Sequence, residues 1–470
     1  MSTELQAKSQ YIKLSDINDS HIGKFITICG RVDNIRKNGS ICFVILRDRC
    51  YTLQSVGFKK EIKDTFYSLL NLKNETYIHL SGSLTKLPSN IAQIESCYYK
   101  NFEFKIDGIQ IISRPVEDLP LSLMDANCIY TEDNQQRSKV LLPTRLDHRY
   151  FELRTPLNNA IFHLKSQLID AYRTFMLKQK HTEINSPKLI GTASETGSSV
   201  FNVKYFNKDA FLAQSPQLYK QMMINADFDG VFEIGPVFRA ENALTHSHLC
   251  EFIGLDLEMR LSPPHYDFKE IIHKLWKCLS YMFSHLETES KTEIEYLQKY
   301  HNYEKINMPE DPIMLTFLEG VKLLETEGFT QNPLEDITTE NERHLGEIIK
   351  KTRDSDIFAL TNYPKSARPF YTEESPENPN YTNSYDIIMR GREICSGAQR
   401  VHDYDKLKSN ILKTGSSSEP FEDYLNSFKY GIMPHGGGGL GLERILMLYF
   451  DLKNVRCCSL FPRDPQRLRP

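Results

Sequence analysis

Residues 238–258 read FRAENALTHSHLCEFIGLDLE, and the last part of this stretch alternates apolar and polar side chains. In a β-strand, residues two positions apart lie on the same face. Positions 252, 254, 256 and 258 would therefore place an aromatic ring, a glycine and two carboxylates on one face, while the apolar positions between them pack on a core. Such a polar face is either a solvated side of an antiparallel sheet or the wall of a binding site. Phe252 favours the wall, because its ring could stack on a base.

The chain just before this strand adds an arginine and further carboxylates. Glu233, Arg239 and Glu241 would share one face of a preceding strand in the same way. Two histidines follow in the connecting loop, without the companion ligands that a zinc site needs. We therefore expect two antiparallel strands within residues 230–259, and a loop whose histidines lie near a phosphate or a ribose rather than a metal.

A glycine-rich segment, HGGGGLGLER, occupies residues 435–444. Gly436, Gly438 and Gly441 formally match G-x-G-x-x-G, but the motif alone is a weak signal, and no Gly-Lys-Ser/Thr of a P-loop follows. We predict a glycine turn that opens a helix and lets a ligand approach the backbone closely. Arg444 would lie in the first turn of that helix, where the helix dipole favours acids. It therefore indicates an anionic partner, which is either a structural carboxylate or a phosphate.

A third polar segment, residues 385–400, reads YDIIMRGREICSGAQR. Asp386 and Glu393 there could hold Mg²⁺ together with phosphate oxygens, because Mg²⁺ usually binds through one or two carboxylates and takes its other ligands from substrate and water. A surface strand with ordinary charges is the other interpretation. The segment alone does not separate the two.

The composition is ordinary for a globular protein and shows no bias toward nucleic acid or membranes. With 470 residues the chain is long enough for two or three domains. Its 57 basic and 61 acidic residues leave a formal net charge of -4, so RNA could be bound only by a local patch. Ten cysteines without a C-x-x-C pair, and the lack of a secretory signal or a membrane-length apolar run, predict reduced thiols, a cytoplasmic location and no membrane partner.

The pattern changes twice along the chain. Residues 1–20 are polar and predict a flexible tail. Five short alternating segments follow, with a helical EIKDTFYSLLNL between the third and the fourth. This order suits a five-stranded OB barrel, which binds oligonucleotides, although another small β-barrel would show the same pattern. Residues 116–150 are polar with scattered prolines and predict a hinge.

The rest of the chain predicts an α+β domain with an antiparallel sheet, because strands and helices alternate there without regular βαβ units. Residues 156–180 form a helical pattern, and Pro187 in the following segment marks a strand or its edge. Residues 262–360 are charged and mostly helical in pattern, and we find no chemistry in them. The apolar face of the first helix consists of Leu157, Ile161, Leu164, Leu168, Tyr172 and Phe175.

Three of these segments together resemble the signature blocks of class II aminoacyl-tRNA synthetases. They are the helix with the strand around Pro187, the FRAE…LDLE block and GGGGLGLERI. An OB domain ahead of them resembles the subclass IIb enzymes for aspartate, asparagine and lysine. From about residue 20 to residue 470, the segments TASETGSSVFNVKYF, LAQSPQLYKQM, EICSGAQRVHD and LFPRDPQRLRP resemble eukaryotic cytosolic aspartyl-tRNA synthetases.

The resemblance implies an architecture and a partner set. We expect a flexible tail at 1–20, an OB-fold anticodon-binding domain at 21–115, a hinge at 116–150 and a class II catalytic domain at 151–470 with a helical insertion at about 262–360. ATP and L-aspartate would form aspartyl-adenylate with Mg²⁺ present, and the aspartyl group would pass to the 3′ end of tRNA(Asp). The first block, with Pro187, forms the interface of a homodimer throughout this class.

The resemblance also assigns roles to individual residues. Catalysis would rest on Arg239, Glu241, Glu393 and Arg444. ATP would contact Arg239, Glu241, Ser247, His248, Leu249, Phe252, Glu393, Gly441 and Arg444. Aspartate would contact Glu195, Gln217, Lys220, Arg239, Asp256, Ser396 and Arg400, with Lys220 and Arg400 on its side-chain carboxylate. Mg²⁺ would be held by Asp386, Glu393 and Ser396. The anticodon would meet Arg36, Asn38, Phe43 and Glu103, although the strand pattern alone favours a buried Phe43.

Two positions depart from the pattern of close relatives. Gly436 and Arg392 stand where Ala and Glu are usual. Arg392 neighbours Glu393, the expected metal ligand, but strand parity would point the two side chains to opposite faces. Two other functions stay open: an enzyme that charges tRNA with asparagine, alone or as well, and an inactive synthetase-like RNA-binding protein. The second would predict loss of the signature arginines and Glu393, which are present.

Overall fold

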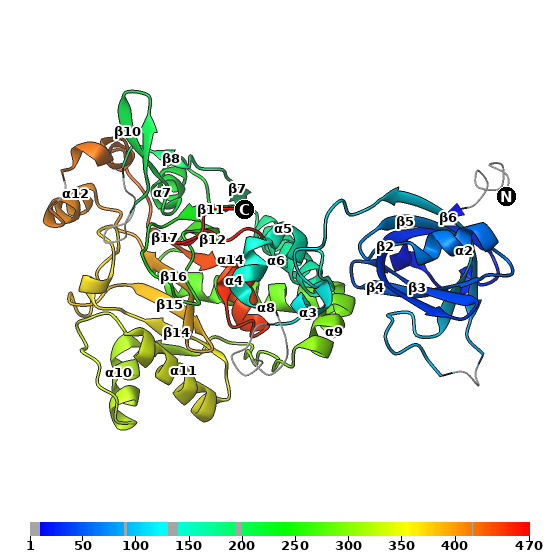
Figure 1. The fold of residues 1–470 in the computed structure, drawn as a ribbon. Coiled ribbons are helices and arrows are strands. Elements are labelled where there is room, and N and C mark those ends of the chain that lie inside the picture. Colours follow the sequence, from blue (N-terminus) through cyan, green and yellow to red (C-terminus); the bar gives the residue numbers. More distant parts are fainter. Residues whose placement is uncertain (1–9, 89–91, 130–139, 193–199, 416) are drawn as a thin grey trace. The chain divides into compact units, whose positions relative to one another are not determined.

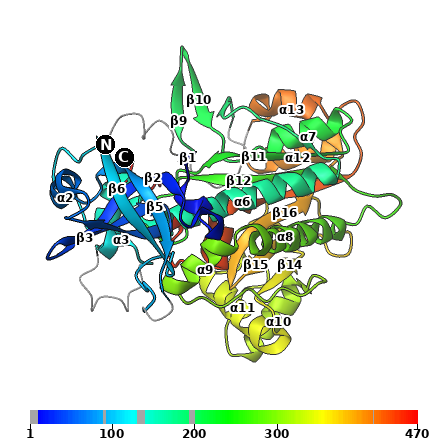
Figure 2. The same cartoon turned by 90° about the vertical axis from the view of Figure 1, so that its right-hand side faces the viewer.

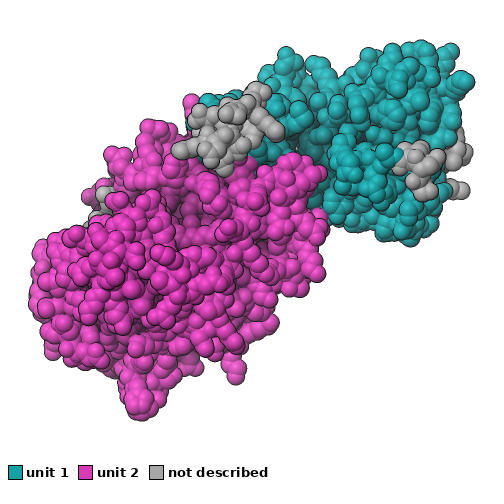
Figure 3. Space-filling model, turned by 90° about the horizontal axis from the view of Figure 1, so that it is seen from below, with its two compact units in different colours: residues 1–128, 134–160 teal, residues 129–133, 161–470 magenta. Residues whose placement is uncertain are grey.

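The computed structural model describes residues 10–88, 92–129, 140–192, 200–415 and 417–470, which fall into two compact units (Figure 3). The barrel unit holds residues 1–128 and 134–160, and the sheet unit holds residues 129–133 and 161–470. None of the ten cysteines, all of which lie among the described residues, forms a disulfide bond. Within the described residues, no helix combines the length and the apolar character needed to cross a membrane.

The barrel unit is a closed β-barrel with one short extra strand. Its elements are β1 (Gln10–Tyr11), β2 (Phe25–Asn38), β3 (Ile41–Asp48), β4 (Tyr51–Phe58), α2 (Lys63–Leu70), β5 (Tyr77–Lys86) and β6 (Phe102–Ser113). The strand order is β1-β2-β3-β4-β6-β5, and β2 also pairs with β5, which closes the barrel. Apart from β1, these are the five predicted strands, with the predicted helix between the third and the fourth. The OB-fold prediction is confirmed.

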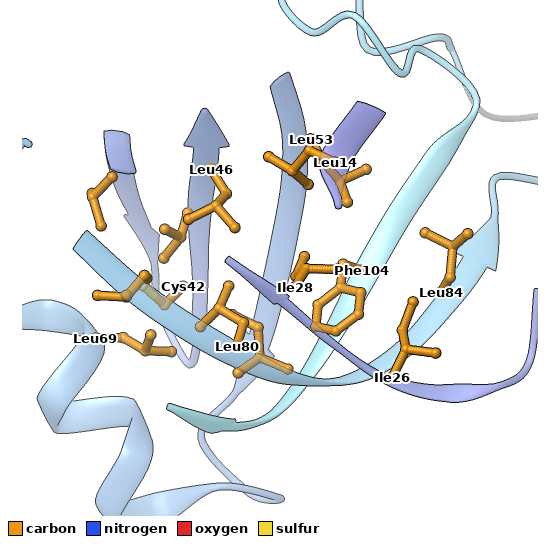
Figure 4. Close-up of a cluster of buried hydrophobic side chains, with 14 of the residues drawn as sticks. Leu14, Ile26, Ile28, Cys42, Leu46, Leu53, Leu69, Leu80, Leu84 and Phe104 are labelled. Atoms are coloured by element: carbon orange, nitrogen blue, oxygen red, sulfur yellow. The ribbon is translucent and has the colours of Figure 1, made fainter. Parts of the chain in front are cut away.

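Alternation along β3 decides which side chains fill the barrel. Cys42, Val44 and Leu46 are fully buried and meet Phe104 of β6 in the core (Figure 4). Phe43 lies between two of these inward residues, is half-buried and does not belong to the core cluster. The interpretation of Phe43 as a buried barrel residue is therefore wrong, because strand parity turns its ring to the outer face.

A buried ion-pair cluster anchors the segment after the barrel. The chain forms three short helices there, α3 (Leu123–Ala126), α4 (Leu142–Asp147) and α5 (Arg149–Glu152). Glu152 accepts hydrogen bonds from Arg145 Nε and Arg149 Nη1, both at 2.5 Å. Burial alone would raise the pKa of Glu152, but the two guanidinium groups hold it below its usual value.

The sheet unit is built on eight strands in the order β13-β14-β15-β16-β17-β12-β11-β7 (Figure 1). Its six inner strands pair antiparallel, and the short β7 and β13 add parallel edges. The prediction of an α+β domain with an antiparallel sheet is confirmed. The strands are β7 (Thr182–Glu183), β11 (Gly230–Phe238), β12 (Glu251–Arg260), β13 (Met314–Thr316), β14 (Ile357–Thr361), β15 (Ser384–Met389), β16 (Arg392–Gln399) and β17 (His435–Gly441).

Helix α6 (Pro156–Lys178) covers the apolar face of this sheet, with α8 (Lys269–Glu289) beside it (Figure 2). The ring of Tyr172 packs edge-on against Phe232 of β11 at 5.9 Å between centroids. Phe232 is the cross-strand partner of Leu257 on β12, which is fully buried. The odd-numbered positions of β12 thus face α6, as the alternation predicted, and the even-numbered positions face the other way.

Further helices surround the sheet. They are α7 (Gln217–Asn225), α9 (Lys291–Tyr300), α10 (Phe317–Thr326), α11 (Thr339–Arg353), α12 (Tyr404–Lys413), α13 (Glu422–Asn426) and α14 (Leu442–Tyr449). A small three-stranded sheet of β8 (Leu189–Ile190), β9 (Asn202–Tyr205) and β10 (Lys208–Leu212) has the order β8-β10-β9. Pro187 lies between β7 and β8.

The glycine-rich segment is a strand, not the predicted turn. β17 lies between β12 and β16, and its glycines face the backbones of both neighbours. A Cβ on Gly437 would lie 2.0 Å from the carbonyl oxygen of Leu257. Glycine is needed here because side chains would push the neighbouring strands apart. The predicted helix does begin directly afterwards, and Arg444 lies in the first turn of α14.

Candidate active site

A cavity of about 340 Å³ lies on the polar face of the sheet. Phe252, Gly254 and Asp256 of β12 line it, so this face of the strand forms the wall of a cavity, as the alternation allowed. The remaining walls come from β11, β16, β17, from the helices α7, α11 and α14, and from loops between these elements.

The FRAE segment contributes two residues to the cavity wall. β11 ends at Phe238, and Arg239 and Glu241 follow it on the cavity wall. The Arg239 guanidinium lies over the Phe252 ring at 5.6 Å, and its buried Nε has no hydrogen-bond partner among the described residues. Glu233 differs from the prediction, because Lys188 Nζ binds it at 2.5 Å and it does not line the cavity.

One end of the cavity is closed by a buried charge network centred on Glu258. Arg400 donates from Nε to Glu258 Oε1 at 2.9 Å, and from Nη2 to Glu258 Oε2 at 3.3 Å and Gln217 Oε1 at 3.0 Å. Burial would raise the pKa of Glu258, but Arg400 and Lys220 hold it below its usual value. Arg400 lines the cavity, and its Nη1 makes no hydrogen bond to the described residues.

Lys220 lies behind this wall. It is 1% exposed, donates to Asp256 Oδ1 at 2.8 Å, and does not line the cavity. Asp256 stands between Lys220 and the cavity. The resemblance implied that Lys220 contacts the ligand directly. Its ammonium group instead binds Asp256 of β12, a contact between distant segments that the sequence does not reveal.

A second layer supports the Arg400 end. His435 of β17 donates from Nδ1 to the Met433 carbonyl at 3.0 Å, and its Nε2 lies 3.2 Å from Gln221 Oε1. Tyr424 donates to the same Gln221 oxygen at 3.0 Å. Burial lowers the pKa of His435 to about 4, so the imidazole is neutral at physiological pH.

The other end of the cavity holds an excess of carboxylates. Glu342 of α11 and Glu393 of β16 both line it, and the Glu393 backbone hydrogen bonds to the Glu342 carboxyl. Burial, followed by the charges of Glu393 and Asp386, raises the pKa of Glu342 to about 8. Burial and Asp386 also raise the pKa of Glu393. Negative charge here is only partly matched by nearby arginines.

Arg368 occupies two of the three predicted metal ligands. It donates from Nη2 to Asp386 Oδ2 and from Nη1 to Ser396 Oγ, both at 2.8 Å. Asp386 and Ser396 are cross-strand partners, as a shared site requires, but Asp386 does not line the cavity. Among the described residues, no group of three His, Cys, Asp or Glu side chains is arranged to hold a metal ion. Of the predicted set, only Glu393 offers an unengaged carboxylate to the cavity.

The nucleotide-side residues of the prediction are brought together. Ser247, His248, Leu249 and Gly441 line the cavity with Arg444. Arg444 donates from Nη1 to the Glu393 carbonyl at 2.7 Å and from Nη2 to the Ser247 carbonyl at 3.4 Å. A structural carboxylate, one of its two predicted partners, is not among its described contacts.

Two features of the cavity were not predicted from the sequence. Glu342 and Thr339 of α11 line it, although we found no chemistry in residues 262–360. Arg392, at the first position of β16, lines it too, together with its neighbour Glu393, although strand parity pointed Arg392 the other way. Glu195 lies outside the described residues.

On the barrel unit, three of the four predicted anticodon residues meet on the outer face. Arg36 is the cross-strand partner of Phe43, and its Nη2 donates to Gln54 Oε1 at 3.2 Å. Gln54 in turn donates to Glu103 Oε1 at 2.7 Å. Gln54 was missed, because a single polar residue in a strand gives no signal. Asn38 is exposed at the end of β2.

Comparison with known proteins gives matches along nearly the whole chain. The family model described as tRNA synthetases class II (D, K and N) matches residues 142–465, and the model of the OB-fold nucleic acid binding domain matches residues 26–112. The cytoplasmic aspartate–tRNA ligase of Rattus norvegicus is 40% identical over 463 residues, which are 98% of this chain and 91% of the relative.

Two solved structures show the same fold. The aspartyl tRNA synthetase from Entamoeba histolytica has a TM-score of 0.89 and 35% identity, covering 100% of this chain and 94% of that one. The asparaginyl-tRNA synthetase from Pyrococcus horikoshii, complexed with asparaginyl-adenylate, has a TM-score of 0.85 and 30% identity, covering 98% and 99%.

Proposed function

We propose, from the fact that the chain belongs to the tRNA synthetases of class II (D, K and N), that it is an aspartate–tRNA ligase. The α-carboxylate of aspartate attacks the α-phosphate of ATP, pyrophosphate leaves, and the aspartyl group of the adenylate passes to the 3′ end of tRNA(Asp). The observation that carries the proposal is Arg400, a guanidinium fixed by Glu258 with one nitrogen left for a ligand at the end of the cavity.

The Arg400 end selects the amino acid. The side-chain carboxylate of aspartate would bind Arg400 Nη1, while Asp256 and Gln217, with Glu195 and Ser396, would hold its α-ammonium side. Lys220 acts through Asp256, which it fixes in place. Asparagine would leave the buried guanidinium without a charge partner, and such a mismatch can discriminate by roughly 10⁴–10⁵-fold.

The opposite end binds ATP. Phe252 stacks on the adenine, and Arg444, Glu241, Gly441 and the loop 247–249 hold the base and the phosphates. Arg239, between the two ends, bridges the substrate carboxylate and the α-phosphate and stabilises the charge of the transition state. Because no covalent enzyme intermediate is needed, positioning and charge stabilisation supply the catalysis.

Mg²⁺ fits the carboxylate-rich end. It would supply charge neutralisation at the phosphates when bound. Glu393 and Glu342 would hold it, since both carboxylates line the cavity and their raised pKa values reflect unbalanced negative charge. Asp386 and Ser396 would bind Mg²⁺ only if their hydrogen bonds from Arg368 were broken.

The barrel unit binds the anticodon of tRNA(Asp) on its outer face. Phe43 stacks on a base, and Arg36, Asn38 and Glu103 provide the polar contacts, with Gln54 linking two of them. The chain acts in the cytoplasm as a homodimer whose interface includes Pro187. The domain boundaries at 21–115, 116–150 and 151–470 belong to this proposal.

Charging of tRNA by the purified protein tests the function. We expect aspartate, and not asparagine, to be esterified to a transcript of tRNA(Asp). Phe43→Ala should lower the efficiency of charging by roughly 10–100-fold, because stacking contributes about 1–3 kcal/mol per base, while adenylate formation stays nearly intact. Phe25→Ala, at a 37% exposed position at the start of β2, is the matched control. Charging with asparagine would favour the alternative enzyme, which the asparaginyl neighbour makes the next candidate.

A further inference from the structure

The loop 239–250 between β11 and β12 is held from behind by a segment of the chain more than 200 residues away. It presents Ser247, His248 and Leu249 to the cavity. Its side-chain hydrogen bonds within the loop join only Thr245 to Ser247 and His248. These local contacts alone do not fix the backbone of the loop against the sheet.

Two backbone hydrogen bonds tie the loop to residues 454–464. The Val455 N–H donates to the His246 carbonyl at 2.8 Å, and the Cys250 N–H donates to the Arg463 carbonyl at 2.8 Å. Val455 itself lines the cavity. The segment therefore forms the layer directly beneath the loop, and also part of the cavity wall.

A buried ion pair completes the attachment. Arg456 donates from Nη1 to the Thr245 carbonyl at 2.8 Å and from Nε to Asp464 Oδ2 at 2.6 Å. Arg456 is 8% exposed, and the side chain of Asp464 is 6% exposed. One planar guanidinium thus reaches a carboxylate and a loop carbonyl at once, which the single ammonium of lysine does not reproduce.

The charge of Arg456 is matched within the segment and not by the ligand. Burial alone would raise the pKa of Asp464, but the hydrogen bonds from Arg456 and the Gln466 backbone hold it below its usual value. On the cavity side, Arg444 donates to the Ser247 carbonyl. Two arginines therefore bind carbonyls of the loop. Arg444, which lines the cavity, binds that of Ser247, and Arg456, which does not, binds that of Thr245.

We propose that Arg456, held by Asp464, is a positioning residue for the nucleotide: it fixes residues 245–248 so that Ser247 and His248 meet ATP. This rests on the proposed function of the cavity. Arg456 touches no substrate, and its effect is confined to the nucleotide side because the amino-acid end is fixed separately by the Glu258 network.

Pyrophosphate exchange with Arg456→Gln tests this. Loss of a hydrogen bond to a charged group corresponds to roughly tenfold or more in binding. We expect the KM for ATP to rise about tenfold or more, and the KM for aspartate to stay within about threefold. Asp464→Asn should give the same split more weakly, and the double variant should be no worse than Arg456→Gln, because the two residues act as one unit. Arg456→Lys should restore only part of the ATP affinity.

Arg390→Gln is the matched control, since Arg390 also binds two backbone carbonyls, those of Leu448 and Glu304, but away from the loop. It should leave both KM values unchanged. An equal rise in both KM values for Arg456→Gln would overturn the proposal and indicate a general structural role. So would an unchanged KM for ATP.

Two further measurements keep the test decisive. Where Arg456→Gln does not fold, Asp464→Asn carries the comparison. Where the wild-type protein shows no exchange with aspartate, the proposed function fails, but titration with ATP alone still decides the positioning role. Weaker ATP binding by the variants than by Arg390→Gln supports it, and equal binding contradicts it.

Discussion

Each end of the cavity has a carboxylate, and the two carboxylates are in opposite electrostatic situations: Glu258 is fully buried behind one end and Glu342 is half-buried at the other. At the amino-acid end, Glu258 sits against Arg400 and Lys220, and its pKa is lowered. At the phosphate end, Glu342 sits beside Glu393, and its pKa is raised to about 8. Burial acts in the same direction at both ends, so the neighbouring charges decide the difference.

This contrast separates two ways of recognising a ligand. The amino-acid end has its charges already paired and oriented, and presents a single guanidinium edge, which suits the selection of one small anion. The phosphate end has an excess of negative charge, which destabilises the protein until a cation such as Mg²⁺ binds there. We therefore expect substitutions at the amino-acid end to destabilise the fold, and the electrostatic balance of the phosphate end to depend on the cations bound there.

The largest effect is expected from Arg400→Leu. Removing Arg400 leaves the buried Glu258 with Lys220, 3.6 Å away, as its remaining cationic partner, which should lower the free energy of unfolding by up to about 3–5 kcal/mol. Aspartate affinity should fall by roughly 10²–10⁴-fold, and ATP affinity should change far less. Thermal unfolding and the two KM values in pyrophosphate exchange measure both effects.

A double variant separates stability from recognition. In Arg400→Leu with Glu258→Gln, most of the lost stability should return, because a neutral amide replaces the carboxylate that Arg400 balanced. Aspartate affinity should stay low. Equal losses of aspartate and ATP affinity in the single variant would contradict the assignment of this end to the amino acid.

A smaller effect of pH is expected at the amino-acid end through His435. Its folded pKa of about 4 lies below the unfolded value near 6.5, so the unfolded state binds more protons in between. The contribution of neutral His435 to the free energy of unfolding is therefore complete above pH 6.5. It falls by up to about 3 kcal/mol as the pH falls toward 4. His435→Asn should flatten this part of the stability profile in urea titrations. His163→Asn, at a side chain 40% exposed, should leave it unchanged.

The smallest effect is expected at the phosphate end, with the opposite sign. The folded pKa of Glu342 lies above the unfolded value, so stability falls as the pH rises from about 4.5 toward 8. Glu342→Gln should therefore raise the free energy of unfolding, by on the order of 1 kcal/mol, and more at pH 8 than at pH 6. Glu347→Gln, on the same helix at a side chain 64% exposed, is the control. A gain that is equal at both pH values would show that the charge of Glu342 is not what limits stability.

Strand alternation was the reliable signal in the sequence. It predicted the barrel strands, the two faces of β12 and the cavity wall at Phe252 and Asp256. It failed at the start of β16, where the adjacent residues Arg392 and Glu393 both line the cavity, although strict alternation would place only one of them there.

Contacts between distant segments could not be predicted. Arg400 and Glu258 are 142 residues apart, and neither segment contains a sequence signal that identifies the other as its partner. Glycines in β17 read as a turn, although close approach of Leu257 demands them within a strand. The carboxylates of α11 belong to a segment for which the sequence predicted only charged, mostly helical structure, because a helix pattern does not tell which sheet the first turn of a helix meets.

Pyrophosphate exchange into ATP, with purified protein and aspartate, asparagine or lysine as the amino acid, tests the central claim most directly. We expect exchange with aspartate alone, and loss of that exchange in Arg400→Leu at aspartate concentrations that saturate the wild-type protein. Exchange with asparagine or lysine that survives Arg400→Leu would contradict it, because the guanidinium at the end of the cavity would then not be what selects the amino acid.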